Sequence, residues 1–271
     1  MGVDLTSYAV QMELAGVGGG WTDVTADVLL GEQPLRFRYG IDGNGPVDRV
    51  ANVGICRFVL DNSASNSAST LGYYSPLHTN VRSGFGFGIN VRVALTYGGT
   101  TYYKFRGRLS AIEPAPGIRG QRTTSCVVVD WMNEAAQYQT GDVALQIGQR
   151  SDQVFSAVLA TITRQPAASS ISAGIDSFTY ALDDLAGNKI PAASIFQNIA
   201  QSELGFIYVK GDTTQGETLV YENRQSRILS TTNSVSLDDD MVDLVVPRDL
   251  AVVFNRIDVP PTQTACCAGS R

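Results

Sequence analysis

The sequence predicts a mainly β protein with an α+β insertion, and three observations lead to this prediction. Apolar residues alternate with polar ones through much of the first half of the chain, which is the period of a half-buried strand. Apolar residues recur at helical spacing in two segments between residues 151 and 205, and strand-like patterns return after residue 235. We therefore expect a β domain over 1–135, an α+β domain over 136–232, a β segment over 233–260 and a flexible tail over 261–271.

The first β domain begins with two alternating segments, residues 8–14 and 35–39. Between them, Gly18-Gly19-Gly20 predicts a turn, because glycine adopts positive-φ conformations that other residues resist. The clearest local pattern comes later, where residues 91–95 and 102–109 flank Gly98-Gly99. Two glycines suit the tight primed turn of an antiparallel hairpin, so we expect one here.

Two further segments complete the predicted first domain. Residues 62–70 are all small or polar and bury too little apolar surface to offset their ordering entropy, so we expect an exposed loop. Residues 123–130, with Cys126-Val127-Val128-Val129 at their centre, predict a strand that is buried on both faces. The domain boundary is placed near residue 135.

The α+β domain is predicted from two helical segments and two strands. Apolar residues from Val154 to Ile162 recur at helical spacing after Ser151-Asp152, which supply an N-cap and a first-turn acid. A second helix is expected to begin near Pro191 and to stop at Gly205. Strands over 206–209 and 218–221 follow, separated by a turn-rich segment.

The end of the chain returns to β character. Strands are predicted over 235–237, 244–246 and 252–259, and they either contribute to the first β domain or begin a second one. Pro260-Pro261 and a small polar tail follow.

Composition limits the function classes. The net charge of −6 and the pI near 4.8 argue against a non-specific grip on nucleic acid, which needs dense Lys and Arg against phosphate. No apolar run approaches the roughly 20 residues that span a bilayer, so no transmembrane segment is expected. The N-terminus lacks the basic and apolar regions of a secretory signal, so we expect synthesis and folding in the cytosol.

The four cysteines do not have metal-binding spacing. Cys56 and Cys126 lie in apolar strand-like runs and are expected to be buried, reduced thiols. Cys266 and Cys267 are adjacent in the polar tail, which we expect to be disordered, with cross-linking between subunits or thiol reactivity as the alternative.

The residues that enzymes use for chemistry are sparse and scattered. His78 is the one histidine of the chain, and no Gly-x-Ser-x-Gly sequence supplies a nucleophile for it. The glycine-rich run 84–88 continues into a strand pattern, whereas a dinucleotide loop opens a helix. Asp183-Asp184 and Asp238-Asp239-Asp240 match no EF-hand loop and are expected to be solvated turns. We therefore predict no enzyme activity, no catalytic residue, no metal and no cofactor.

A series of short motifs is informative through its order. The motifs are Trp21-Thr22-Asp23-Val24-Thr25-Ala26-Asp27-Val28-Leu29, Phe58-x-Leu60-x-Asn62, Tyr74-Ser75-Pro76, Val91-Arg92-Val93, Phe105-x-Gly107-x-Leu109, Ile199-Ala200-Gln201-Ser202-Glu203-x-Gly205-Phe206-Ile207-Tyr208 and Val253-Phe254-Asn255-Arg256-Ile257-x-Val259. Over roughly residues 5 to 260, this order resembles the bacteriophage and prophage minor tail proteins of the tail (baseplate) hub family.

The resemblance implies a fold and a place of work. Hub proteins of this kind carry split β-barrels of tail-tube type with an α+β insertion, so residues 5–130 would form the first barrel, 136–230 the insertion, and 235 onward the start of a second barrel. They form a ring at the distal end of the tail tube, with a trimer favoured and a hexamer possible. We expect only the start of a second barrel after residue 235, whereas family members usually continue, and this difference puts the closure in question.

The resemblance also implies partners and a location. The partners would be copies of the chain, the tail tube or distal tail protein, the tape measure protein and the tail fibres. The protein would be assembled in the host cytoplasm, belong to the virion tail, and serve host attachment and genome ejection. Strand edges left free in one subunit would pair with those of its neighbours and so close the ring.

Two other functions compete with this hypothesis. A carbohydrate-binding module of a receptor-recognising tail fibre would use Trp21, Tyr73, Tyr74 or Tyr103 as stacking surfaces, and would need those rings exposed and coplanar. A hydrolase that degrades cell wall would depend on His78, Asp183 and Asp184.

Overall fold

The computed structural model describes residues 5–43, 45, 47–117, 121–141, 143–183 and 189–227. The strands predicted after residue 233, the tail, the acidic run 238–240 and the adjacent cysteines Cys266 and Cys267 lie outside the described residues.

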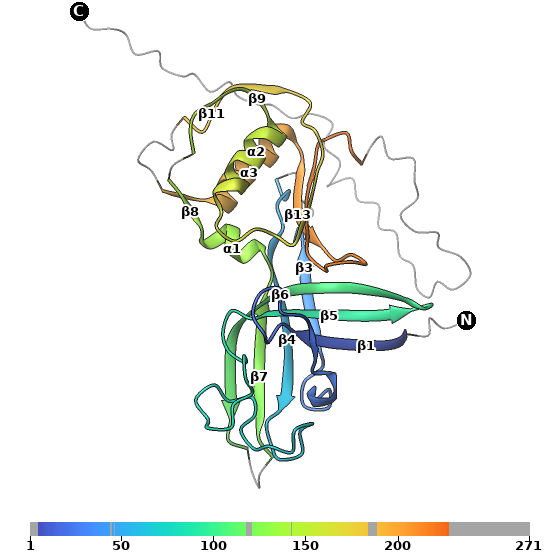
Figure 1. The fold of residues 1–271 in the computed structure, drawn as a ribbon. Coiled ribbons are helices and arrows are strands. Elements are labelled where there is room, and N and C mark those ends of the chain that lie inside the picture. The colour runs from blue at the N-terminus through green and yellow to red at the C-terminus, as the bar shows by residue number, and fades with distance from the viewer. Residues whose placement is uncertain are drawn as a thin grey trace, which may run out of the picture. The chain divides into compact units, whose positions relative to one another are not determined.

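Seven antiparallel strands form the first sheet, in the order β2-β1-β5-β6-β7-β4-β3 (Figure 1). They are β1 (Leu5–Met12), β2 (Thr22–Asp23), β3 (Arg36–Gly40), β4 (Asn52–Asp61), β5 (Asn90–Tyr97), β6 (Thr100–Ala115) and β7 (Thr123–Val129), with a short 3-10 helix η1 (Thr25–Asp27) after β2. The prediction of a mainly β fold is confirmed. Among the described strands, β2 and β3 pair on one side only, so this sheet is open and does not close into a barrel.

The predicted β5–β6 hairpin is confirmed. Tyr97 lies opposite Thr100, and Gly98 and Gly99 between them have φ values of +55° and +79°. Positive φ at both turn positions belongs to the primed turn whose twist matches that of the strands, and glycine reaches it without a steric penalty.

β6 is long enough to serve two neighbours in succession. Its first half pairs with β5, from Thr100 to Arg108, and its second half pairs with β7, from Arg108 to Ala115. Irregular register between Leu109 and Ala111 marks a bulge, which lets the strand bend where it changes partner. As a result, β5 runs across the direction of β7 and β4 (Figure 1).

One face of this sheet carries the first hydrophobic core, as period-two patterning requires. Its buried residues are Val10, Met12, Val24, Val28, Cys56, Phe58, Leu60, Tyr74, Phe85, Val91, Val93, Phe105, Leu109, Cys126 and Val128. β7 was expected to be buried on both faces, and this is wrong: Cys126 and Val128 are buried, whereas Val127 and Val129 are half-buried. The strand belongs to an antiparallel sheet that has its core on one side.

The second region combines three small sheets with three helices. Its elements are α1 (Met132–Gln137), β8 (Gln139–Thr140), β9 (Gln146–Arg150), α2 (Ser151–Thr161), β10 (Ala168–Ile171), β11 (Ser177–Ala181), β12 (Ile190–Pro191), α3 (Ala192–Glu203), β13 (Phe206–Lys210) and β14 (Thr218–Glu222). The sheets are β10-β14-β13, β11-β9 and β12-β8. Both predicted helices and both predicted strands are confirmed.

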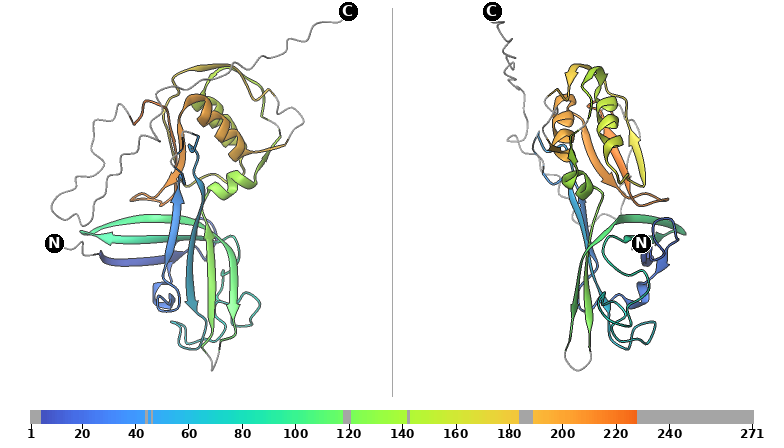
Figure 2. Two further views of the ribbon diagram at one scale, coloured as in Figure 1. Left: turned by 180° about the vertical axis from the view of Figure 1, so that it is seen from behind. Right: turned by 60° about the vertical axis from the view of Figure 1, so that its left-hand side comes forward.

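Aromatic side chains hold the second core together. The Phe155 ring of α2 lies 4.6 Å from Phe196 of α3 and 5.4 Å from Tyr221 of β14, between ring centroids. The two helices lie side by side (Figure 2). Trp131 also packs in this core, and its indole Nε1 donates to the carbonyl of Arg164 at 2.8 Å.

The ends of both helices differ in detail from the prediction. Ser151 is the first helical residue of α2 and Arg150 is the N-cap, so Ser151 does not cap the helix. α3 ends at Glu203, and its C-cap is Leu204, which takes the left-handed conformation with φ of +55°, rather than Gly205. Gly205 is needed for space, since a Cβ there would lie 2.6 Å from the carbonyl oxygen of Glu222.

Within the described ranges, backbone hydrogen bonds connect the two regions at two places. Ala51 donates to the carbonyl of Ile207 at 2.8 Å, and Ile207 donates to that of Arg49 at 2.9 Å, so the segment before β4 extends the three-stranded sheet beside β13. Tyr103 and Asp212 exchange N–H···O bonds of 2.8 and 3.0 Å. This second contact uses the edge that β6 leaves free before it reaches β7.

Candidate functional site

The outer edge of the seven-stranded sheet is formed by β3. Within the described residues, β4 is the one strand that pairs with it, with Phe37 opposite Cys56 and Arg38 opposite Ile55. The other side of β3 therefore presents backbone N–H and C=O groups that no described strand satisfies. Such an edge is a template for pairing with a further strand.

Arginines gather on the exposed face beside this edge. Arg36 and Arg57 are exposed and lie opposite each other, and Arg38 lies opposite Ile55, which is 37% exposed. We call Arg36, Arg38, Ile55 and Arg57 the β3 face. Arg38 forms an ion pair with Asp42 and so holds the pKa of that carboxyl below its usual value.

A groove of about 190 Å³ lies along the same edge. Its lining residues are Arg38, Tyr39, Gly40, Asp42, Asn52, Val53 and Ile55. The register of β3 against β4 shifts between Arg38 and Gly40, which marks a bulge there. The edge thus offers an unpaired ladder, positive charge and partly apolar side chains within one surface.

The connection between β4 and β5 is ordered by buried polar groups. The Asp27 carboxylate is 1% exposed and accepts hydrogen bonds from the Ser67 N–H at 2.6 Å, the Ser67 hydroxyl at 2.7 Å and the Tyr74 hydroxyl at 2.5 Å. Arg82 in turn donates to the Tyr74 oxygen at 2.8 Å. Burial and the adjacent Asp27 carboxylate raise the pKa of Tyr74, so the phenol remains a donor.

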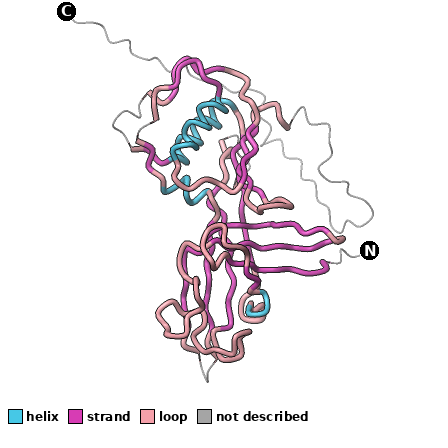
Figure 3. Tube along the Cα trace, in the orientation of Figure 1, coloured by secondary structure: helices cyan, strands magenta, loops and turns pink. Residues whose placement is uncertain are grey.

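The expectation that residues 62–70 form an exposed loop is therefore wrong for part of the segment. It has no strand or helix (Figure 3), yet Asn62, Ser63 and Asn66 are buried. Asn62 accepts from the Tyr74 N–H at 2.7 Å, and its own amide donates to Ser75 at 2.7 Å. Hydrogen bonds, rather than apolar burial, fix this chain segment.

Two apolar side chains project from the same connection. Leu77 is fully exposed and Phe87 is 66% exposed. Phe87 belongs to the glycine-rich run 84–88, which leads into strand β5 as predicted and not into a helix.

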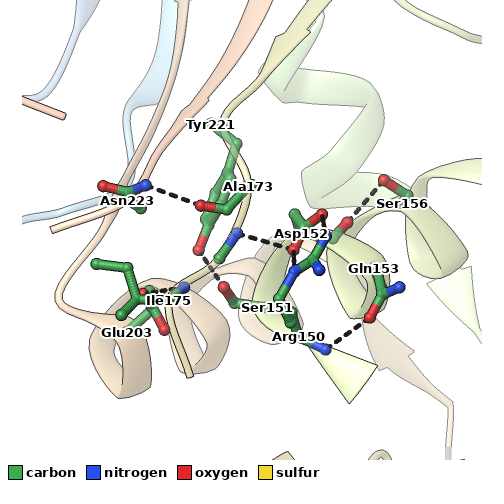
Figure 4. Close-up of polar contacts among 11 residues, drawn as sticks. Arg150, Ser151, Asp152, Gln153, Ser156, Ala173, Ile175, Glu203, Tyr221 and Asn223 are labelled. Carbon is green, nitrogen blue, oxygen red and sulfur yellow. Dashed lines mark hydrogen bonds and ion pairs between the residues drawn. The ribbon is translucent and has the colours of Figure 1, made fainter. Parts of the chain in front are cut away.

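A polar network anchors residues 173–175 to the second core (Figure 4). Gly174 donates to Asp152 at 2.8 Å, Ile175 donates to the buried Glu203 at 3.0 Å, and Asn223 donates to the carbonyl of Ala173 at 2.8 Å. Arg150 pairs with Asp152 at 3.0 Å and lowers the pKa of that carboxyl.

Ser151 lies within this network, where the described residues give its hydroxyl a phenol rather than a base as hydrogen-bond partner. Its hydroxyl oxygen accepts a hydrogen bond of 2.6 Å from the Tyr221 hydroxyl, and burial raises the pKa of Tyr221 to about 12. A phenol with so high a pKa stays protonated near neutral pH and cannot accept the serine proton. The arrangement therefore supports a structural role.

A second groove, of about 340 Å³, lies over α3 and β11. It is lined by Val154, Phe178, Tyr180, Ala181, Leu182, Asp183, Ile190, Ile195, Asn198, Ile199 and Ser202. Tyr180 and its partner Ile147 on β9 are 63% and 60% exposed, so apolar surface extends beyond the groove.

The residues of the competing hydrolase hypothesis are not brought together by any described contact. His78 accepts a hydrogen bond from the Asn80 N–H at 3.1 Å in the β4–β5 connection. Asp183 is exposed and lies at the rim of the second groove. Asp184 lies outside the described residues.

The four aromatic residues of the carbohydrate hypothesis do not form a single exposed platform. Tyr74 is fully buried and meets Tyr73 edge-on at 71°. Trp21 and Tyr103 instead enclose the Arg92 guanidinium, whose central carbon lies 4.2 and 4.0 Å from the two ring centroids. These rings are engaged in cation–π contacts within the fold.

Metal and thiol chemistry find little support in the described part of the chain. No group of three or more His, Cys, Asp or Glu side chains is placed there to hold a metal ion. Cys56 and Cys126 are buried free thiols, as predicted, and burial raises the pKa of Cys56 to about 12. No helix among these residues has the length and apolar character to cross a membrane.

Sequence reasoning missed the burial of several carboxylates, among them Asp27, Asp130 and Glu217, which are 1%, 3% and 8% exposed. Asp27 and Glu217 take partners from distant parts of the chain, Tyr74 and Ala167, so no local pattern marks them. The motif that contains Asp27 was identified, but not the role of its carboxylate.

Comparisons with known proteins give similarity at the level of solved structures. No family model and no curated protein matches the chain. The 43 kDa tail protein of prophage MuSo2 from Shewanella oneidensis is 11% identical with a TM-score of 0.46, over 80% of this chain and 56% of that one. The tail protein from Neisseria meningitidis MC58 is 12% identical with a TM-score of 0.42, over 79% and 50%.

A Francisella PdpA–VgrG complex chain is also similar, at 10% identity and a TM-score of 0.45, over 90% of this chain and 36% of that one. The chain thus spans about half the length, or less, of these structures. Two of these neighbours are named as tail proteins, one of them from a prophage, and the third belongs to a PdpA–VgrG complex.

Proposed function

We propose that the protein is a structural subunit of a phage tail that assembles through the free edge of β3 into a ring at the distal end of the tail tube. In this position it anchors host-recognition proteins and takes part in attachment and genome ejection. The protein acts through the surface that it presents to other tail proteins, and it catalyses no reaction.

The observation that carries the proposal is the one-sided pairing of β3 in the seven-stranded sheet. An unpaired ladder edge is a liability in a monomer and an interface in an assembly, because a neighbouring strand satisfies its N–H and C=O groups. The order of the sequence motifs supports the tail as the place of that assembly.

The β3 face is positively charged, although the chain as a whole is acidic. The chain carries a net charge of −6, whereas Arg36, Arg38 and Arg57 gather beside the edge. An acidic surface of a neighbouring subunit or tail protein would complement them, which favours the right partner and orients its approach.

The test is the native mass of the full chain at micromolar concentration, alone and with purified tail components. We expect a ring, and a shift to the smaller species in the charge reversal Arg36→Glu. Lys189→Glu, which makes the same change of charge at an exposed site of the other region, is expected to leave assembly intact. A strictly monomeric chain that joins no tail component would remove the hypothesis.

A further inference from the structure

A buried carboxylate lies where the seven-stranded sheet meets the second region. Asp130 follows β7 and is 3% exposed. Its Oδ1 accepts a hydrogen bond from the Met132 N–H at 3.1 Å, whereas Oδ2 has no partner of standard hydrogen-bond geometry among the described residues, although the Gly54 backbone beside the carboxyl opposes the rise in its pKa. Oδ2 packs against Gly54, where a Cβ atom would lie only 2.4 Å away. A buried acceptor left in this condition is rare in folded proteins.

A buried donor faces the same region from β6. Arg106 uses Nη1 to donate to Gln215 at 3.0 Å, and its guanidinium carbon lies 5.1 Å from the Trp21 ring centroid. Its Nε is buried and, like Asp130 Oδ2, has no hydrogen-bond partner in the described part of the chain. One unsatisfied donor and one unsatisfied acceptor thus belong to neighbouring elements.

Both residues line one small cavity. Its volume is about 10 Å³, and its remaining lining residues are Tyr39, Lys104, Phe105, Val209, Lys210, Gly211 and Gly216. A cavity of about 10–15 Å³ has room for the centre of one water molecule, and such a water is held when polar groups line the cavity.

We propose that the fold forms a hydration site in this cavity, in which one water molecule accepts a hydrogen bond from Arg106 Nε and donates one to Asp130 Oδ2. The pairing satisfies both buried groups at once, which neither could achieve in an apolar void.

Charges of both signs lie around the cavity. Arg106 and Asp130 line it, and the buried Glu217 carboxylate interacts with both of them, so neither a cation nor an anion meets a wall of one opposite sign. A neutral molecule that donates and accepts at once is complementary to both walls, and no larger solute fits the volume.

Because the cavity lies between three elements of the fold, this water has a structural role. Arg106 belongs to β6, Asp130 joins β7 to α1, and Gly211 and Gly216 belong to the β13–β14 turn. A bridging water there ties the sheet, the start of the second region and this turn into one hydrogen-bonded junction.

A crystal structure of the full wild-type chain, at a resolution that shows ordered water, tests the proposal. We expect a single peak at about 2.7–3.2 Å from both Asp130 Oδ2 and Arg106 Nε. A direct hydrogen bond between the two side chains, an empty cavity, or a peak with the anomalous signal of an ion would overturn it.

Two variants sharpen the test. Asp130→Asn keeps the shape and the ability to bond to water, so the peak should remain, whereas Asp130→Val removes the acceptor and the peak should be lost. A peak that persists in Asp130→Val would show that the carboxylate does not hold the water. If that variant does not fold, the wild-type and Asp130→Asn structures decide the matter.

Discussion

Tyr74 donates its hydroxyl proton to the carboxylate of Asp27, a residue 47 positions earlier in the chain, across 2.5 Å. The bond joins the β4–β5 connection to the helix that follows β2, and both residues are almost completely buried. Buried hydrogen bonds thereby anchor a loop of small polar residues to η1.

Replacement of Tyr74 by Phe should destabilise the protein by about 1–3 kcal/mol, because the buried Asp27 carboxylate and the Arg82 guanidinium both lose a partner. Urea denaturation followed by circular dichroism measures the change. Tyr73→Phe is the matched control, since the neighbouring ring is half-buried, and it should change stability little. Equal losses in the two variants would show that the Asp27 bond does not order the loop.

Gly107→Ala should weaken the junction of β6 and β7. A Cβ at this position would lie 2.2 Å from the carbonyl oxygen of Val129, a backbone atom that cannot move aside alone. We expect a loss of about 1–3 kcal/mol in the free energy of unfolding, as for other overpacked sites. Gly31→Ala, where a Cβ meets nothing within 4 Å, should be nearly neutral. A neutral Gly107→Ala would mean that the two strands separate more easily than their pairing indicates.

Glu217 should make stability fall as the pH rises. Burial raises the pKa of Glu217 to about 7, although Arg106 and Arg108 oppose the shift. The folded state therefore keeps a proton that the unfolded state releases near pH 4 to 5, and this contribution is complete below that range and lost as the pH passes 7. Its size is on the order of 3 kcal/mol.

Unfolding free energies at pH 5 and pH 8 measure this contribution. Burial also raises the pKa of Asp130 to about 6, so this residue adds to the fall in the same direction. Glu217→Gln should flatten the profile but leave the part due to Asp130. An unchanged slope in Glu217→Gln would show that Glu217 is ionised in the folded protein at both pH values.

The buried pair of Ser151 and Tyr221 is suited to a double-mutant cycle. Ser151→Ala leaves the Tyr221 hydroxyl without its 2.6 Å acceptor and should cost about 1–3 kcal/mol. Adding Tyr221→Phe removes the stranded group, so the double variant should lose less than the sum of the single variants. Ser156→Ala, on the exposed side of the same helix, serves as the control. Strict additivity would contradict a direct coupling.

Cys56 and Cys126 should resist alkylation in the folded protein. Both thiols are fully buried, and burial raises their pKa values, so thiolate forms only when the sheet opens. Iodoacetamide labelling mapped by peptide mass spectrometry should show modification that rises together with global unfolding in urea. Rapid labelling of either residue without denaturant would contradict the described core.

The parts of the fold that follow from local periodicity could be predicted. Gly98-Gly99 between alternating segments specifies the β5–β6 hairpin, and the apolar stripes ending at Ile162 and Gly205 specify the two long helices. Each of these signals is contained within a single stretch of chain.

The parts that depend on distant partners could not. Serine is a common N-cap residue, but the Ser151 hydroxyl instead accepts a hydrogen bond from Tyr221, 70 residues away. Asn62 and Ser67 resemble solvated loop residues until Tyr74 is placed beside Asn62 and Asp27 beside Ser67. The free edge of β3 likewise becomes visible only when the strand order is known, because a sequence does not state which strand is last in a sheet.

The bend of β6 has a consequence for cooperativity. This single strand of 16 residues bonds to β5, to β7 and, through Tyr103, to Asp212 in the second region. Fraying of the strand would release all three neighbours, so their amide protons should exchange with solvent at a common rate set by one opening event. The two hydrophobic cores then melt as a single foldon, even though each has its own aromatic centre.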